Sequence, residues 1–234
     1  GVQTCALPIS VFAAINYYDG QGFMVPKKLG VKSAKQLNGA TVCLQSGTSS
    51  VQALADYFKA NNIKFKPVMF DTTEATQSAF LSGRCQVYTT DMSDLAGART
   101  RARNPQDFEI LPETISKEPL GPSVRRGDDE WFQIVRWSFY AMVEAEENGI
   151  SSQNVDELRA SSKVPQVMRL VGTGDDAGKL LGLDKDWSYR IIKQVGNYGE
   201  SWTKNFGPTT PLNLPRGLNN LWTQGGILYA PPIR

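Results

Sequence analysis

The sequence predicts an α/β fold with doubly wound, mostly parallel sheets, and three observations support this prediction. Short apolar or β-branched runs alternate with helical patterns between residues 40 and 111. The connections between these segments are short, as in parallel α/β sheets. Two of the apolar runs pass directly into small polar residues, at residues 46–50 and 89–91. Ligands bind beyond the carboxyl ends of the strands in such sheets, so these two places form the candidate binding site.

The periodicity of the apolar residues predicts the order of the elements. Residues 11–25 are expected to be extended, because glycines separate short apolar runs there. A short helix is expected over 32–39, capped by Ser33 and stopped by Gly39. Residues 118–122 interrupt the pattern and are interpreted as a crossing between two lobes. Strands are expected at 40–44, 64–70, 86–90 and 108–111, and helices at 51–60, 74–82, 93–103, 130–148, 155–159, 164–171 and 187–196.

Composition excludes several classes of protein. With 234 residues the chain is long enough for one large domain or two small ones. Its hydrophobic content of 41% contains no run of about 18 apolar residues, so direct membrane insertion is not expected. The net charge of +2 comes from scattered residues, which give nucleic acid no basic face to bind.

The chain contains no histidine. This absence excludes Ser-His-Asp and Cys-His catalysis, and it excludes zinc sites with histidine ligands. Lysine, tyrosine, cysteine and carboxylates remain as possible acids, bases or nucleophiles, so the prior for an enzyme is lowered without being removed. No metal site and no cofactor are predicted.

Three cysteines are present, at positions 5, 43 and 85. Cys43 and Cys85 lie in or at the start of the two strands that lead to the candidate site. In an oxidising compartment they can form a disulfide between neighbouring strands. The alternative is a pair of buried thiols that act as small apolar residues. The spacing alone leaves both possibilities open.

Residues 1–9 resemble the conceptual translation of a common sequencing adapter and are excluded from the fold prediction. On this interpretation the natural protein begins further upstream, and a signal peptide would not be visible in this sequence. The alternative is a genuine short apolar segment such as the end of a signal peptide. That alternative lacks a basic start and a long enough apolar run.

The two polar strand ends have complementary chemistry. The loop at Gly47 lacks the GxxxxGK[ST] spacing of a nucleotide-binding loop. The helix that follows it still presents free amides and hydroxyls that attract a carboxylate. Asp91 offers a carboxylate that can accept an ammonium group. Each half has a plain alternative, because Thr48, Ser49 and Asp91 can all serve as helix caps. The pairing of the two ends in one sheet favours a zwitterion such as an amino acid.

Five separated motifs, in order, carry a resemblance to a known family. They are residues 17–25 (YYDGQGFMV), 43–48 (CLQSGT), 83–91 (GRCQVYTTD), 115–122 (ISKEPLGP) and 225–234 (GGILYAPPIR). With them the chain resembles the periplasmic substrate-binding protein of a general L-amino-acid ABC transporter. The resemblance extends from about residue 11 to the last residue.

This resemblance implies a two-lobed periplasmic-binding-protein fold of type II that closes on a free amino acid. Each lobe would contain a doubly wound, mostly parallel sheet, and the first lobe would be incomplete. The implied organisation after the adapter-like residues 1–9 has three parts. These are residues 10–26, a remnant of the first lobe with the first hinge crossing; residues 27–118, the inserted second lobe; and residues 119–234, the second crossing and the C-terminal part of the first lobe.

The resemblance also implies roles for individual residues. Thr48 and Ser49 would bind the α-carboxylate beside the Gly47 backbone, and Asp91 would bind the α-ammonium. Gln45 is a weaker candidate next to them. The paired cysteines of the family correspond to Cys43 and Cys85, which favours a disulfide between them.

The family's carboxylate-binding arginine lies upstream of Tyr17 and has no counterpart in this sequence. We therefore expect this chain to bind amino acids weakly or not at all, and the product of the complete gene to bind them. The implied protein is a periplasmic monomer without catalysis or cofactor that delivers amino acids to the membrane permease subunits of an ABC transporter.

Two other functions remain open. An enzyme on the same scaffold, such as a cyclohexadienyl-type dehydratase, needs an acid or base in the cleft, and Glu118 is the nearby candidate. A receptor-type amino-acid-sensing module would be tethered to a membrane segment in the complete gene. Turnover of substrate, or such a tether, would distinguish them from a transport protein.

Overall fold

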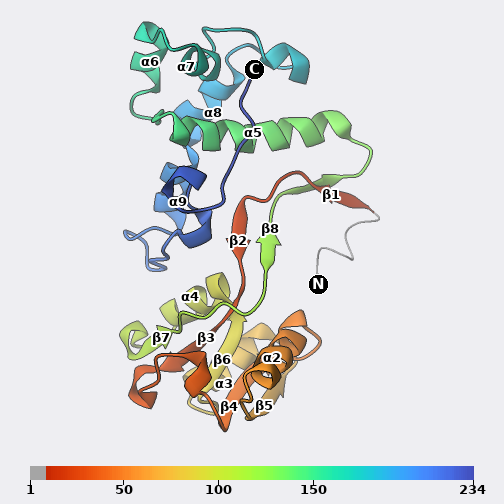
Figure 1. Ribbon diagram of the computed structural model, residues 1–234, viewed down its shortest axis with the longest axis vertical. Helices are drawn as coiled ribbons and strands as arrows, with labels where there is room; N and C mark the ends of the chain where they lie inside the picture. Colours follow the sequence, from red (N-terminus) through yellow and green to blue (C-terminus); the bar gives the residue numbers. More distant parts are fainter. Residues whose placement is uncertain (1–8) are drawn as a thin grey trace. The chain divides into compact units, whose positions relative to one another are not determined.

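The computed structural model describes residues 9–234, which form two compact units (Figure 1). The sheet unit comprises Tyr18–Leu120, and the helical unit comprises residues 9–17 and 121–234. The adapter-like segment, apart from Ile9, lies outside the described residues.

The chain passes between the two units twice, at residues 17–18 and 120–121. At these crossings β2 (Tyr17–Asp19) and β8 (Glu118–Leu120) pair in a two-stranded sheet (Figure 1). The residues that follow β2 form β3 (Gln21–Pro26), whose first five residues are buried in the sheet unit.

The sheet unit contains a five-stranded sheet with the order β5-β4-β6-β3-β7. Its remaining strands are β4 (Ala40–Gln45), β5 (Phe65–Phe70), β6 (Val87–Asp91) and β7 (Phe108–Ile110). The strand β4 pairs in parallel with both β5 and β6. The connections β4 to β5 and β5 to β6 run through helices, as parallel neighbours require. This part of the sheet confirms the predicted α/β pattern.

The strand β3 runs in the opposite direction, antiparallel to both β6 and β7. The connection from β3 to β4 contains two short 3₁₀ helices, Lys27–Leu29 and Ala34–Gln36, and no crossover helix. The chain therefore re-enters the sheet at the same end at which it left, so β4 runs in the direction opposite to β3. The helix expected over 32–39 is this second 3₁₀ turn, with Ser33 as its cap.

Helices cover both faces of the sheet. They are α2 (Ser49–Ala60), α3 (Thr73–Leu81) and α4 (Met92–Thr100). On one face Leu54 and Phe58 of α2 pack against Phe23, Val42 and Leu44. On the other face α3 and α4 pack against the alternate residues of the same strands, including Met24, Cys43 and Tyr88. Successive strand residues point to opposite faces, so both faces of these central strands are apolar.

Cys43 and Cys85 form a disulfide with a Cα–Cα distance of 5.6 Å. Cys43 lies in the middle of β4 and Cys85 precedes β6, the neighbouring strand. Both side chains are buried on the face covered by α3 and α4. The bond is the one that the family resemblance implied, and it ties together the two strands that lead to the candidate site.

The helical unit is built around the long helix α5 (Asp129–Glu147), which is capped by the Asp128 side chain. Further helices are α6 (Val155–Ser161), α7 (Pro165–Leu170), α8 (Trp187–Val195) and α9 (Tyr198–Asn205). The described strands of this unit, β1 (Ser10–Phe12) and β9 (Ser123–Arg125), form an antiparallel pair. Its core contains residues of α5, α6, α7 and α8 together with Ile233 near the C-terminus. The sequence predicted these helices except α9.

The irregular C-terminal segment is fastened to the helices by a buried carboxylate. Glu144 of α5, which is 1% exposed, accepts hydrogen bonds from the Ile233 amide (2.9 Å) and from Gln166 Nε2 (3.1 Å). Arg169 Nε donates to the Ile233 carbonyl at 3.0 Å. Burial raises the pKa of Glu144, and the hydrogen bonds from Ile233 and Gln166 oppose this shift.

Candidate functional site

The first half of the site is the turn between β4 and α2. Gly47 has φ +73°, a left-handed conformation that glycine adopts without strain, and open space surrounds the place where a side chain would lie. Thr48 occupies the N-cap position of α2, but its side chain makes no capping hydrogen bond. Instead Thr48 Oγ1 donates to the Gln45 carbonyl at 3.0 Å. The first amides of α2, beginning at Ser49, therefore have no capping side chain from Thr48 and suit an anion.

The second half is the turn between β6 and α4. Asp91 ends β6 and occupies the N-cap position of α4, but its side chain also makes no capping hydrogen bond. Some other helices have the cap: Thr72 Oγ1 accepts from the Ala75 amide, and the Asp128 carboxylate accepts from the Trp131 amide. At α6 and α8 the N-cap residues also make no capping hydrogen bond. The capping interpretation thus accounts for the positions of Thr48 and Asp91 but not for their side chains.

The sheet brings these two halves together. The strands β4 and β6 are parallel neighbours, so the turns that follow them leave the same edge of the sheet. Gln45 and Ser46 fix the first turn to the loop after β5. Gln45 Nε2 donates to the Asp71 carbonyl (3.2 Å), and Thr73 Oγ1 donates to Gln45 Oε1 (2.8 Å). Both ends of the Gln45 amide are engaged in this way, which suits a positioning role.

Carboxylates surround the Asp91 side chain. The pKa of Asp91 is raised to about 6. Burial is the largest cause, and the nearby carboxylates of Asp19, Glu118 and Asp94 add to it. Asp19 is itself held in place, because its Oδ2 accepts from Ser93 Oγ at 2.5 Å and its Oδ1 accepts from the Gly20 amide at 2.8 Å. An excess of negative charge at one end of the site favours a cationic group there.

Two residues that the sequence interpretation missed lie beside the Asp91 half of the site. Gln21 lies opposite Asp91 in the ladder between β3 and β6, and Asp19 contacts the start of α4 through Ser93. Gln21 is a polar residue between two glycines, directly before the apolar run of residues 23–25. That pattern is the signal that would have marked it as a buried polar residue with a specific partner.

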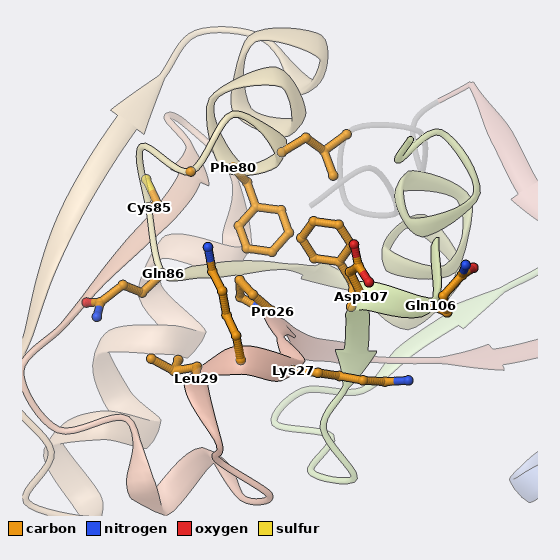
Figure 2. A pocket seen from close by; sticks show the side chains of 12 residues that line it. Pro26, Lys27, Leu29, Phe80, Cys85, Gln86, Gln106 and Asp107 are labelled. Carbon is orange, nitrogen blue, oxygen red and sulfur yellow. The ribbon is translucent and has the colours of Figure 1, made fainter. Parts of the chain in front are cut away.

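A separate cavity lies at the opposite end of the sheet and contains none of the predicted ligand-binding residues. Its volume is about 680 Å³, and its lining includes Pro26, Lys27, Phe80, Cys85 and Asp107 (Figure 2). Pro26 is the last residue of β3 and Gln21 the first, which separates the two places by about 16 Å along the strand. The cavity and the candidate site are therefore distinct.

Comparisons with known proteins extend these observations. No protein-family model matches the chain. The chain is 55% identical over 223 residues to YhdW of Escherichia coli K12, described as an amino-acid ABC transporter-binding protein. It is equally similar to BztA of Rhodobacter capsulatus, a glutamate/glutamine/aspartate/asparagine-binding protein. These matches cover 95% of this chain and 65% and 66% of the two relatives, so the chain spans slightly less than two thirds of their length.

A solved structure matches the chain over most of its length. It is an ABC transporter periplasmic binding protein from Brucella ovis with glutathione bound, 50% identical, with a TM-score of 0.89. The match covers 96% of this chain and 71% of that one. The chain belongs to the family of ABC transporter periplasmic binding proteins.

Membership in this family of ABC transporter binding proteins accounts for the fold class and places the protein outside the cytoplasm. The relatives are named as transporter-binding proteins rather than as enzymes. Within residues 9–234, no helix combines the length and the apolar character needed to cross a membrane. An oxidising location also suits the Cys43–Cys85 disulfide.

Proposed function

We propose that the protein captures free L-amino acids in the periplasm and delivers them to the permease subunits of an ABC transporter, without catalysis and as a monomer. The observation that carries this proposal is the pair of N-cap residues, Thr48 and Asp91, whose side chains cap neither helix. One turn offers amides and hydroxyls to an anion, and the other offers a carboxylate to a cation. An α-amino acid carries both charges on one carbon.

In the proposed complex the α-carboxylate lies against the first amides of α2 and the open backbone of Gly47. It also accepts from the hydroxyls of Ser49 and Thr48, and the Thr48 hydroxyl turns away from the Gln45 carbonyl to do so. The α-ammonium pairs with Asp91. Gln45 supports the turn. The sheet unit (Tyr18–Leu120), which contains the predicted inserted lobe of residues 27–118, would act as the lobe that is inserted into the chain of the other lobe, with the crossings before and after it as hinges.

A second ligand deserves a test because of one observation. The similar protein from Brucella ovis was solved with glutathione bound. The γ-glutamyl residue of glutathione carries a free α-ammonium and a free α-carboxylate on one carbon, so the same two turns would bind it. A γ-glutamyl peptide is therefore the second candidate ligand for this site.

Calorimetry with the product of the complete gene tests the proposal. L-Glutamine and glutathione are titrated, together with glutaramate, which is glutamine without its α-ammonium group. The expected result is saturable binding of at least one of the first two and an affinity for glutaramate that is lower by about tenfold or more. Absence of binding by both ligands, or release of a reaction product from either, would refute the proposed transport function.

The affinity for amino acids is expected to fall as the pH decreases below about 6. An ammonium group pairs with the ionised form of Asp91, whose pKa is raised to about 6 by burial and by the neighbouring carboxylates. Binding therefore competes with a proton in acid. The dissociation constant should be constant above about pH 7 and should rise by up to about tenfold per pH unit below pH 6.

Calorimetry across this pH range, in buffers with different ionisation enthalpies, measures both the affinity and the proton released. An affinity that stays constant down to about pH 5 would contradict the assignment of Asp91 to the ammonium group.

A further inference from the structure

Gln21 is a buried polar side chain beneath the candidate site. It lies in β3 directly opposite Asp91, and 1% of its surface is exposed. Burying a side-chain amide is unfavourable unless its donors and acceptor find partners. A methionine would fill similar space without that cost, so the presence of an amide here requires a reason.

The amide nitrogen of Gln21 connects the two elements that carry the candidate ligand groups. Nε2 donates to the Ser50 carbonyl in the first turn of α2 (3.0 Å) and to Thr89 Oγ1 in β6 (2.8 Å). Thr89 Oγ1 in turn donates to the Gly22 carbonyl at 2.7 Å, so it accepts from Gln21. Both partners of the amide are acceptors, which determines that the NH₂ group faces them.

The backbone of Gln21 reaches a third element. Its amide donates to Ser116 Oγ at 3.0 Å, and its carbonyl accepts from the Ile115 amide at 2.8 Å. Ser116 Oγ donates to the carboxylate of Glu118 at 3.0 Å. Gln21 thus contacts the start of α2, the end of β6 and the segment that leads into β8.

The remaining atom of the amide, Gln21 Oε1, is buried and has no hydrogen-bond partner among residues 9–234. Buried oxygens without a partner are rare in native proteins. The side chain of Gln21 is therefore best explained by its two donated bonds. The bond to Ser50 ties Gln21 to the first turn of α2, whose N-cap residue Thr48 makes no capping hydrogen bond.

Resting on the proposed function, we propose that Gln21 is a positioning residue that sets the separation between the first turn of α2 and Asp91. A fixed separation makes the site selective for ammonium and carboxylate groups borne by one carbon. In a β-amino acid an additional carbon separates the two groups, and a rigid site binds it less well. Without the Gln21 bonds the two turns move independently, and the selectivity decreases.

Amide hydrogen exchange tests the positioning role without any ligand. Gln21→Met is compared with Gln77→Met, which removes another buried glutamine of the sheet unit. Gln77 is 6% exposed, and its Oε1 accepts from Arg101 at 2.6 Å, away from α2. We expect Gln21→Met to accelerate exchange by about tenfold or more in the second turn of α2, whose amides donate to the carbonyls of the first turn, and at the end of β6. Gln77→Met should leave the α2 amides unchanged, and equal exchange of the α2 amides in both variants would overturn the proposal.

Affinity measurements with the product of the complete gene test the selectivity. The probes are L-glutamate and its isomer β-glutamate, in which two carbons rather than one separate the ammonium from the nearest carboxylate. Gln21→Met is expected to lower the L-glutamate affinity by about tenfold and the β-glutamate affinity by about threefold or less, whereas Gln77→Met leaves the ratio unchanged. A parallel loss of both affinities in Gln21→Met would overturn the selectivity.

The two proposals fail in different ways. If the unsubstituted protein binds neither isomer nor any other amino acid, the proposed function fails and the selectivity fails with it. The exchange measurement still decides whether Gln21 holds the turn of α2. If the unsubstituted protein binds amino acids and the ratio does not respond to Gln21→Met, the proposed function stands and the inference about Gln21 is refuted.

Discussion

Replacing Asp91 with asparagine is expected to weaken the binding of L-amino acids by about a hundredfold near neutral pH. A hydrogen bond between charged groups contributes about 1.5–3 kcal/mol, and each 1.4 kcal/mol changes affinity about tenfold. The effect should lie at the upper end of this range, because the variant leaves the ligand's ammonium group partly buried without its counter-charge. Asparagine preserves the shape of the side chain, so the loss reports the charge.

The same substitution is expected to stabilise the unliganded protein. The pKa of Asp91 is raised to about 6, mainly by burial and then by Asp19, Glu118 and Asp94. The folded state therefore holds this proton more tightly than the unfolded state does, and stability is lost as the pH rises from about 4 to 6. Above that range asparagine should raise the free energy of unfolding by about 1 kcal/mol. This is less than the full pKa shift converts to, because Asp91 is only half-buried and water screens its neighbours.

Asp107→Asn is the matched control, because it makes the same chemical change at the opposite end of the same sheet. Calorimetry and denaturant unfolding at about pH 5 and pH 8 measure both effects. We expect Asp107→Asn to leave affinity and stability unchanged within about twofold and 0.5 kcal/mol. If Asp91→Asn and Asp107→Asn had the same affinity, Asp91 would not contact the ligand.

Removal of the disulfide is expected to lower the stability of the sheet unit by about 4 kcal/mol. Cys43 and Cys85 are separated by 42 residues, and closing a loop of this length reduces the entropy of the unfolded chain by about that amount at 25 °C. The variant with both cysteines replaced by alanine should show this loss. A reducing agent should have a similar effect on the unsubstituted protein and no effect on the variant.

The two units can be followed separately in this experiment. All five tryptophans lie in the helical unit, so tryptophan fluorescence reports the unfolding of that unit. Hydrogen exchange of the amides of β4 and β6 reports the sheet unit. The disulfide should change the second measurement and leave the first unchanged. Equal stability of β4 and β6 with and without the bond would contradict the prediction.

The strands and helices of the sheet unit follow closely from local sequence patterns. Val42, Leu44, Leu54 and Phe58 occupy the positions that the apolar periodicity assigns to the core. Helix α9 escaped prediction because it is short, begins at Tyr198 with only two residues between it and the end of α8, and has few apolar residues. Its capping box, formed by Asn197 and Glu200, is the local signal that marks its start.

The direction of β3 was not accessible from the sequence in the same way. A parallel and an antiparallel strand present the same alternation of side chains, so the apolar pattern of residues 21–26 is silent about direction. The pairing of β3 with β6 and β7 in the folded sheet decides it. This pairing also places Gln21 opposite Asp91, and the importance of Gln21 therefore emerges only in the folded chain.

The sequence by itself determined the α/β class, the family, the two polar strand ends and the exclusion of histidine chemistry. These properties depend on residue types and their spacing along the chain. Only the tertiary structure decided that Thr48 and Asp91 cap neither helix and that Asp91 lies among carboxylates. A side chain's hydrogen-bond partner and its pKa depend on residues that are distant in sequence and adjacent in space.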